Sequence, residues 1–407
     1  MAAENAKTAA PRPLAGLRIL DLSNVIAGPL GTFFLASLGA DVIKIERPKV
    51  GDLARKMGAD VSRNRKLMGA SYLATGGGKR SVTLNLQSEK GREMVRRMVA
   101  QADAVFENFR PGTMEKLGLG FEDLRKIKPD LVYCAVSGFG QNGPLAQRPA
   151  YDQIIQGMSG LMNLTGPVDA APSRVGFVVS DSFAAAMASL ATVSAIMRAR
   201  ATGIGAMVDV SMLETSLVMG AWIVSDYLNS DSPPQRLGND SRSAAPSGTF
   251  ATKDGHINIV CNEDHQFAAL SDAVGRPEWK TSPDWRDRHA RFSRKFEMKA
   301  MLEAVLVEKT TADWEDILAR HGVPCGGILS VPDVLALPHM VERGFVQECG
   351  VEDGRVTRVA GIGVQVDGEA YGPTTKPPAL GEQNDEIYAE FGFSADEIAA
   401  LRADNVI

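Results

Sequence analysis

The chain has 407 residues, of which 44% are apolar and 23% are charged, and its formal net charge is −5 at pH 7. These values are typical of a globular protein with a substantial buried core, and the slight acidic excess without a long Lys/Arg run argues against nucleic-acid binding. The four cysteines form no Cys-x-x-Cys pair, so the sequence predicts neither a metal site nor a disulfide framework.

Residues 1–13 are predicted to be a flexible tail. The segment is rich in Ala and has neither the apolar stretch of a secretory signal nor the Arg-rich, acid-poor character of a transit peptide. No apolar run of the sequence approaches the roughly 20 residues that a membrane span needs. We therefore expect a cytoplasmic protein whose partners are small molecules or other subunits, with no membrane and no nucleic acid among them.

The first third of the chain alternates short apolar strands with amphipathic helices. Strands are predicted at 17–22, 42–45, 82–86, 104–106 and 131–136, and helices at 33–38, 89–102 and 122–127. This alternation predicts an α/β fold, in which a parallel sheet carries helices on both faces and binds its ligands outside the carboxyl ends of the strands. Residues 14–229 are assigned to this Rossmann-like large domain.

The later segments complete the large domain and add a smaller one. We expect a helix at 151–162, a strand-like apolar run at 175–180, a strand at 207–210 and a long apolar helix at 213–228. A linker rich in Ser and Pro follows, then a hairpin over 248–260 with its turn at Asp254–Gly255. Residues 230–330 are predicted to be an α+β domain, and 331–407 to return to the large domain with a strand at 355–366 and a last helix opened by a Ser394–Glu397 capping box.

Asp181 stands between the apolar run at 175–180 and a small-residue helix expected from Ser182. On pattern alone the carboxylate has two interpretations. Asp is a preferred helix N-cap residue, so a structural role suffices. A carboxylate that faces both free helix N–H groups and an apolar wall is also placed to do chemistry.

Several familiar catalytic motifs are missing from the sequence. No GxGxxG follows the first strand, and no GxSxG occurs. Gly76-Gly-Gly-Lys79 lacks the first Gly and the final Ser or Thr of a phosphate loop, so it predicts a turn before a strand. All five histidines lie beyond residue 250. What the large domain offers is a carboxylate, with cations that could hold an anionic ligand: Arg47, Lys79, Arg80, Arg110 and Lys116.

A series of sequence blocks carries a resemblance to a known family. The blocks are Leu14-Ala-Gly-Leu-Arg-Ile-Leu-Asp-Leu22, Ala27-Gly-Pro29, Leu38-Gly-Ala-Asp-Val-Ile-Lys-Ile-Glu-Arg47, Lys79-Arg-Ser81, Glu107-Asn-Phe-Arg-Pro-Gly112 and Gly322-Val-Pro-Cys325. In this order they resemble the signature blocks of the family III CoA-transferases, which include formyl-CoA transferase and carnitine CoA-transferase. The resemblance extends from Leu14 to about Val406.

The resemblance implies an activity and a set of site residues. Arg174-Val-Gly-Phe-Val-Val-Ser-Asp181 matches the family block that carries an acyl-accepting Asp, so Asp181 is the implied nucleophile. The cations of the implied CoA site can pair with phosphates. The implied CoA contacts are Ile26, Ala27, Arg47, Leu84, Gln87, Asn108, Phe109, Arg110, Lys116, Tyr151 and Asp152.

The expected reaction moves CoA from an acyl-CoA donor, with succinyl-CoA as a candidate, to a carboxylic acid through an aspartyl-CoA thioester. No tightly bound cofactor and no metal are expected, because the CoA thioester itself supplies the activation. The resemblance implies an interlinked homodimer. A second carboxylate on the substrate would need a cation, for which the candidates are Arg148, Arg236 and Arg242.

Two departures from the formyl-CoA transferase pattern bear on the substrate. Ile26 replaces a polar residue, and the glycine-rich loop over the aspartyl intermediate has no counterpart in residues 239–250, so oxalate and formate are not expected. The racemase branch has Gly-His-Asp where this chain has Ala150-Tyr151-Asp152, and a phenol is a poor base at neutral pH. An acyl-CoA racemase or isomerase and a non-catalytic acyl-CoA-binding protein are the alternatives.

Overall fold

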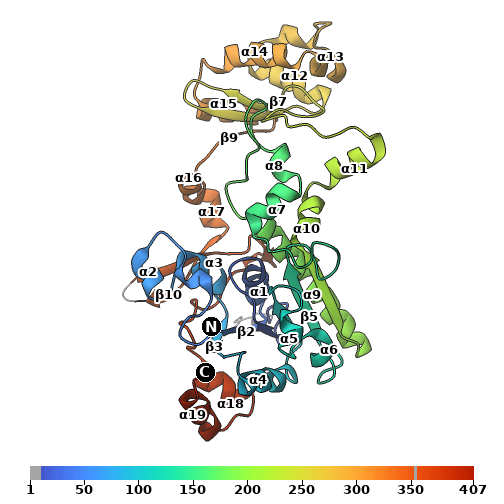
Figure 1. The fold of residues 1–407 in the computed structure, drawn as a ribbon. Helices are drawn as coiled ribbons and strands as arrows, with labels where there is room; N and C mark the ends of the chain where they lie inside the picture. The colour runs from blue at the N-terminus through green and yellow to red at the C-terminus, as the bar shows by residue number, and fades with distance from the viewer. Residues whose placement is uncertain (1–10, 353–354) are drawn as a thin grey trace. The chain divides into compact units, whose positions relative to one another are not determined.

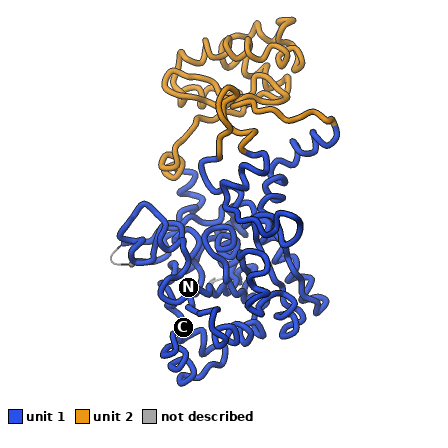
Figure 2. The backbone as a smooth tube through the Cα atoms, in the orientation of Figure 1, with its two compact units in different colours: residues 1–161, 175–229, 338–407 blue, residues 162–174, 230–337 orange. Residues whose placement is uncertain are grey.

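The computed structural model describes residues 11–352 and 355–407, and the chain folds into two compact units (Figure 2). Unit 1 comprises the chain as far as Leu161, Val175–Asn229 and Pro338–Ile407, and unit 2 comprises Met162–Arg174 and Ser230–Leu337. The chain thus enters unit 2 at the predicted linker but returns at 338 rather than 331. Residues 162–174, which the sequence places in the large domain, belong to unit 2, where Gly166 and Pro167 lie beside Gly238. Of the predicted tail, residues 1–10 lie outside the described residues.

Six strands form one sheet in unit 1 (Figure 1). They are β1 (Arg18–Asp21), β2 (Asp41–Glu46), β3 (Arg80–Thr83), β4 (Ala104–Glu107), β5 (Val132–Ser137) and β6 (Ala206–Ser211). Their order is β3-β2-β1-β4-β5-β6 and each neighbouring pair is parallel. The predicted parallel sheet is therefore confirmed. In this doubly wound order the connections on either side of β1 and β4 run in opposite directions, so a crevice opens beyond the carboxyl ends of these two strands.

Helices cover both faces of this sheet. Successive strand residues point to opposite sides, so Leu20 and Ile43 join one apolar core while Ile19 and Val42 join the other. The helices of this part of the chain are α1 (Ala27–Ser37), α2 (Val61–Arg65), α3 (Ala70–Gly76), α4 (Glu89–Val99), α5 (Thr113–Lys116), α6 (Phe121–Leu124), α7 (Asp152–Met158), α9 (Val179–Thr202), α10 (Met212–Met219), α11 (Ala221–Ser230), α17 (Pro338–Glu342), α18 (Asn384–Glu390) and α19 (Ala395–Ala403), with the 3-10 helix η1 (Leu53–Lys56). Helix α8 (Leu161–Leu164) begins in unit 1, and its last three residues belong to unit 2. The first core also takes side chains from α4, α5, α18 and α19, and the second from α1 and α9.

The small residues of α9 let it approach α1 closely. A Cβ added at Gly31 of α1 would lie 3.0 Å from the Phe106 ring and 3.1 Å from the Ala185 carbonyl oxygen. The Ser189 hydroxyl donates to the Gly31 carbonyl at 2.9 Å. The alanine-rich sequence after Asp181 is therefore explained by helix packing.

Unit 2 contains a three-stranded antiparallel sheet, β7 (Ser247–Ala251), β8 (His256–Val260) and β9 (Cys325–Gly327), in the order β7-β8-β9. The predicted hairpin is confirmed, and its turn closes with the Thr252 N–H donating to the Gly255 carbonyl at 3.0 Å. Trp279, Trp285 and Trp314 are buried in the core of this unit. Its helices are α12 (Asp264–Ala273), η2 (Pro277–Lys280), α13 (Arg288–Ser293), α14 (Lys295–Leu306), α15 (Thr311–Arg320) and α16 (Val331–Ala336).

Three predicted elements differ in the structure. Residues 175–178 form no strand, and Phe177 and Val178 are exposed, so this apolar run is not part of a sheet. The helix expected at 213–228 is divided at Gly220 into α10 and α11. The strand expected at 355–366 is the second half of a hairpin, β10 (Val346–Glu352) with β11 (Arg355–Ala360), followed by the short pair β12 (Gln365–Val366) and β13 (Glu369–Ala370).

Helix α9 corrects the expectation that no segment is long enough for a membrane span. In the described part of the chain it is the one helix with the length and apolar composition to cross a bilayer. Core helices also pass this test, and 39% of the apolar window of α9 is buried inside the protein. Its length serves packing against α1, β5 and β6.

Candidate active site

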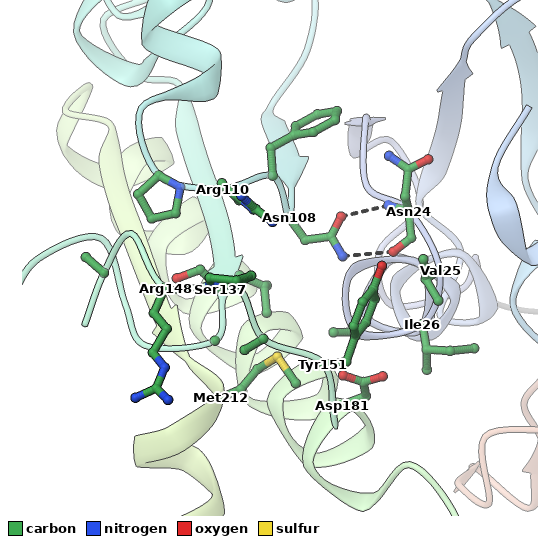
Figure 3. A pocket seen from close by; sticks show the side chains of 18 residues that line it. Asn24, Val25, Ile26, Asn108, Arg110, Ser137, Arg148, Tyr151, Asp181 and Met212 are labelled. Atoms are coloured by element: carbon green, nitrogen blue, oxygen red, sulfur yellow. Dashed lines mark hydrogen bonds between the residues drawn. The ribbon is translucent and has the colours of Figure 1, made fainter. Parts of the chain in front are cut away.

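The carboxyl ends of β1 and β4 are joined by a pair of hydrogen bonds. The Asn24 N–H donates to Oδ1 of Asn108 at 2.7 Å, and Nδ2 of Asn108 donates to the Asn24 carbonyl at 2.8 Å (Figure 3). Asn24 follows β1 and Asn108 follows β4, so the bonds tie together the two loops at the crevice between these strands. Several of the predicted site residues lie in these loops.

A cavity of about 270 Å3 opens beside these loops, and we call it the Asp181 pocket (Figure 3). Its wall comes from the ends of β1, β4 and β5, from the loop before α7 and from the first turn of α9. Among the described residues that line it, Asp181 is the only carboxylate. The lining residues that the sequence also predicts are Ile26, Ala27, Asn108, Phe109, Arg110, Arg148, Tyr151 and Asp181.

Asp181 is not the N-cap of its helix, which corrects the structural interpretation of the sequence. Helix α9 begins at Val179, so Asp181 lies in its first turn, and the N-cap residue Val178 makes no side-chain cap. The cap comes from Asp152 on α7, whose Oδ1 accepts the N–H groups of Ser180 at 2.8 Å and of Asp181 at 3.3 Å. Because another residue takes the free N–H groups, the Asp181 carboxylate is left facing the pocket.

Burial and a neighbouring charge make Asp181 a weak acid. Removal of the side chain from water disfavours its charged form and is the largest cause, and the Asp152 charge adds to it, so the pKa of Asp181 is raised to about 7. No described residue forms a salt bridge with Asp181. A carboxylate of this kind is more basic than an ordinary Asp and is placed to attack an electrophile.

A second cavity, of about 620 Å3, lies along the ends of β1, β2 and β3, and we call it the strand-end cavity. It shares Asn24 and Phe109 with the Asp181 pocket. The predicted residues Arg47, Leu84 and Gln87 line it, together with Lys56. A long ligand with an anionic end could therefore extend from the Asp181 pocket into the strand-end cavity past Phe109.

The chain matches CoA-transferase family III over residues 14–384. The protein belongs to this family. The match covers most of the chain, which confirms the resemblance carried by the sequence blocks. Membership also makes the chain an enzyme of the CoA-transferase class, because its curated relatives are named as such.

The relatives of this family III chain include enzymes with different acid substrates. It is 38% identical to the acetyl-CoA:oxalate CoA-transferase of Acetobacter aceti over 93% of this chain and 96% of that protein. It is 33% identical to the succinyl-CoA:glutarate CoA-transferase of Mus musculus, over 93% of this chain and 86% of that protein. A crystal structure of a CaiB/BaiF family protein from Brucella suis has a TM-score of 0.82 and 35% identity, covering 94% of this chain and 100% of that one.

Two predicted residues of this family III site lie outside both cavities. Lys116 is exposed at the end of α5 and lines neither. Asp152 is only 5% exposed, and its carboxylate faces α9 and Gln156. The structure thus gives Asp152 a set of protein partners, and a contact with CoA stays a prediction for both residues.

Two of the cations proposed as anion holders are committed to protein partners. Nζ of Lys79 is buried and lies 2.9 Å from Asp21, and it also donates to Thr32 and the Pro29 carbonyl. Arg80 pairs with Asp41 and Glu390. Both residues hold the sheet and its flanking segments together, so the interpretation of these two as ligand cations is corrected. Arg236 and Arg242 belong to unit 2.

The β1–α1 loop of the site is held in a strained shape by buried charges. Val25 has φ of 68°, in the left-handed region that a β-branched residue rarely adopts. Its N–H donates to Oδ1 of Asp52 at 2.9 Å, and Nζ of Lys44 donates to the Ser23 carbonyl at 2.7 Å. Lys44 and Asp52 are themselves 3.1 Å apart. These contacts fix the backbone that carries Ile26 and Ala27 into the pocket.

Asp52, Lys44 and Glu107 were missed as site-building residues. Glu107 ends β4 and accepts the Phe109 N–H at 2.6 Å, and burial, the largest cause, raises its pKa to about 8. Glu107 lies inside a matched sequence block, so a signal existed for it. Lys44, in the middle of an apolar strand, was also a signal, because a buried lysine requires a partner. Asp52 lies in a polar loop and offered no such signal.

Proposed function

We propose that the protein transfers CoA from an acyl-CoA donor to a carboxylic acid, and that Asp181 is the nucleophile. The observation that carries this proposal is the placement of Asp181 as the one carboxylate among the described residues of a pocket at the β1/β4 crevice. Its raised pKa gives a basic carboxylate that is still largely ionised at slightly alkaline pH. Family membership supplies the reaction class.

The proposed chemistry has two symmetrical halves. An oxygen of Asp181 attacks the thioester carbon of the donor, which gives a mixed anhydride and CoA thiolate. The thiolate attacks the aspartyl carbonyl, so the donor acid leaves and Asp181 carries CoA as a thioester. The acceptor carboxylate attacks this thioester and releases CoA thiolate. The thiolate then takes the acceptor acyl group from the new anhydride, which regenerates the Asp181 carboxylate.

CoA is proposed to lie across both cavities. Its reactive end would face Asp181, Ile26 and Ala27, and the rest would pass Asn108 and Phe109 into the strand-end cavity, where Arg47 and Lys56 can pair with phosphates. CoA is a substrate in this scheme, and no tightly bound cofactor takes part.

A dicarboxylic acid is the proposed acceptor class. Arg148 lines the same pocket as Asp181 and forms no ion pair within the described residues, so it can hold a second carboxylate. The acids in the relatives' names, oxalate and glutarate, are dicarboxylic. The oxalate relative argues against our expectation that oxalate is excluded, and oxalate therefore belongs with succinate and glutarate in a substrate screen.

The alternatives receive less support from the site. A racemase needs a base for an α-proton, and the described residues that line the pocket include no histidine, while Tyr151 is 70% exposed. A non-catalytic acyl-CoA-binding protein would not require a carboxylate at the position of Asp181.

We propose a cytoplasmic homodimer as the working form. The four free cysteines fit a reducing compartment, and exposed apolar side chains on α9, α10 and α11 fit a subunit interface.

Trapping of the intermediate tests the proposed function. The protein is incubated with acetyl-CoA or succinyl-CoA, quenched with hydroxylamine or borohydride, and digested for mass spectrometry. We expect a hydroxamate or a reduced side chain at Asp181. Asp181→Ala should show no adduct and lose at least about a thousandfold in kcat, because a covalent route is removed.

The control for this experiment is Asp209→Asn, which removes an exposed carboxylate that accepts the Gln141 N–H and does not line the pocket. It should keep both adduct and transfer. Absence of an adduct with every donor, together with full transfer by Asp181→Ala, would show that the proposed mechanism is wrong.

A further inference from the structure

Two side chains of helix α7 hold the backbone segment that leads to Asp181. Asp152 accepts hydrogen bonds from the N–H groups of Ser180 and Asp181, and it also accepts one from Nε2 of Gln156 at 2.6 Å. Gln156 in turn accepts the Val175 N–H at 2.9 Å and donates to the Phe177 carbonyl at 3.1 Å. Asp152 and Gln156 are buried, with exposed fractions of 5% and 0%. The two side chains thus fix the backbone from Val175 to Asp181, which contains no regular strand.

The position of Asp152 changes the electrostatics of the helix end. The N-terminus of a helix carries partial positive charge that would favour ionised Asp181. Here the Asp152 carboxylate occupies the N–H groups of Ser180 and Asp181 and brings a negative charge next to the nucleophile. A side chain that only had to cap the helix could be neutral, as Ser and Asn are. Capping of the helix therefore does not by itself explain why the side chain at position 152 is charged.

No cationic side chain among the described residues pairs with Asp181 to compensate the negative charge of Asp152. Burial is the larger cause of the raised pKa, and Asp152 is the charged group that contributes to it. Arg110 and Arg148 come from the loops after β4 and β5 and are exposed, and Tyr151 is also exposed. No salt bridge joins Asp181 to any of them in the described part of the chain.

We propose that Asp152 is a positioning residue for the nucleophile, which fixes the first turn of α9 through its hydrogen bonds and sets, through its charge, the pH range in which Asp181 attacks. This inference rests on the proposed function for its catalytic consequence. A more basic carboxylate is a better nucleophile once it is ionised, at the cost of being protonated at mildly acidic pH. The charge of Asp152 thus favours turnover near and above pH 7.

The test removes the charge of Asp152 and keeps the acceptor that caps α9. In Asp152→Asn, Oδ1 can still accept the Ser180 N–H, but the negative charge is gone and the bond that Oδ2 accepts from Nε2 of Gln156 is lost. The ionisation of Asp181 is followed by NMR of protein labelled with carboxyl-13C aspartate, and the Asp181 resonance is the one missing in Asp181→Asn. We expect this resonance to titrate near 7 in the unmodified chain and about one pH unit lower in Asp152→Asn.

Kinetics give a second readout that a purely structural role would not produce. The acid limb of the pH profile of kcat should also move to lower pH in Asp152→Asn. At pH 6 the fraction of enzyme with ionised Asp181 should then be about fivefold larger in Asp152→Asn than in the unmodified enzyme. At pH 8 it should be equal or slower, because its carboxylate is less basic. Asp152→Glu keeps the negative charge, so the acid limb of kcat should stay at the same pH. The longer side chain of Glu can lower kcat at every pH without moving this limb.

Two outcomes decide between the proposals. An unchanged Asp181 titration in Asp152→Asn would overturn the inference, whatever the kinetics show. A lowered titration with normal transfer by Asp181→Ala would leave the electrostatic pair intact and defeat the proposed function instead. If Asp152→Asn fails to fold, Asp152→Ser supplies a second neutral variant with a hydroxyl acceptor, and the same shift is required of it.

Discussion

Two arginines line the Asp181 pocket, and we expect them to serve different substrates. Replacement of Arg148 by Met should lower kcat/KM for succinate or glutarate by about tenfold to a hundredfold, because a charged hydrogen bond to the second carboxylate is lost. Transfer to acetate should change little, and so should the KM for the acyl-CoA donor. Steady-state kinetics with paired mono- and dicarboxylic acceptors measure this.

Arg110→Met is the matched control for Arg148→Met, because both arginines are exposed and line the same pocket. Arg110 is an implied CoA contact, so its loss should raise the KM for the donor with every acceptor. An equal loss for acetate and glutarate in Arg148→Met would contradict the specificity assigned to Arg148.

At the residue scale, the sequence predicts Asp181 as the nucleophile because the matching block aligns it with an acyl-accepting Asp. The structure places Asp181 in a pocket with Asn108 and Tyr151, and its catalytic role stays a prediction. The source of its environment was not predicted. Asp152 and Asp181 are separated by 29 residues, and no local pattern reveals that one carboxylate caps the helix that carries the other.

At the scale of elements, the β1–α1 loop depends on buried charges that lie elsewhere in the chain. Asp52→Asn should lower the free energy of unfolding by about 3 kcal/mol, because it leaves the buried Lys44 ammonium without its nearest carboxylate. It should also lower transfer activity, since the Val25 backbone loses the charge that holds it. Denaturant titration followed by tryptophan fluorescence gives the change in stability.

Asp60→Asn is the control for this prediction. Asp52 caps η1 by accepting the Ala54 N–H, and Asp60 likewise caps α2 through backbone N–H groups, but the side chain of Asp60 is 43% exposed. Its replacement should lower the free energy of unfolding much less than Asp52→Asn does. Similar effects of the two substitutions would show that the buried ion cluster does not stabilise the loop.

The positions of most strands and helices could be predicted from the sequence, but the order of the strands in the sheet could not. The apolar runs of β1, β2, β4 and β5 are short and periodic, so the sequence locates them within one or two residues. The order β3-β2-β1-β4-β5-β6 comes from long-range pairing and has no local signal. The run at 175–180 was misinterpreted as a strand because apolar composition does not distinguish a strand from an exposed segment such as Phe177 and Val178.

At the scale of the whole molecule, the apolar surface of unit 1 supports the proposed homodimer. Leu190, Met197, Trp222 and Leu228, on α9 and α11, are all more than 60% exposed. Light scattering should give twice the chain mass of 43.5 kDa. Trp222→Glu should weaken association by about 2 kcal/mol or more, roughly thirtyfold in Kd, because buried tryptophans commonly dominate interfaces.

Ile127→Glu is a suitable control for the association experiment, because Ile127 is an exposed apolar residue after α6. It should leave the mass unchanged. A monomeric unmodified chain, or a Trp222→Glu protein that associates as before, would contradict the assignment of this surface to a subunit interface.

The raised pKa of Asp181 also links the reaction to the stability of the fold. A free Asp has a pKa near 3.8, whereas the folded chain keeps this proton until about pH 7. The folded state therefore binds more protons than the unfolded state between these values, and the free energy of unfolding falls as pH rises through them. Above pH 7 Asp181 of the resting enzyme is ionised in its buried site, and the free energy of unfolding is lowered by the full amount. The proposed CoA thioester has no charge at Asp181, so formation of the covalent intermediate would relieve that cost and make the loaded enzyme the more stable species.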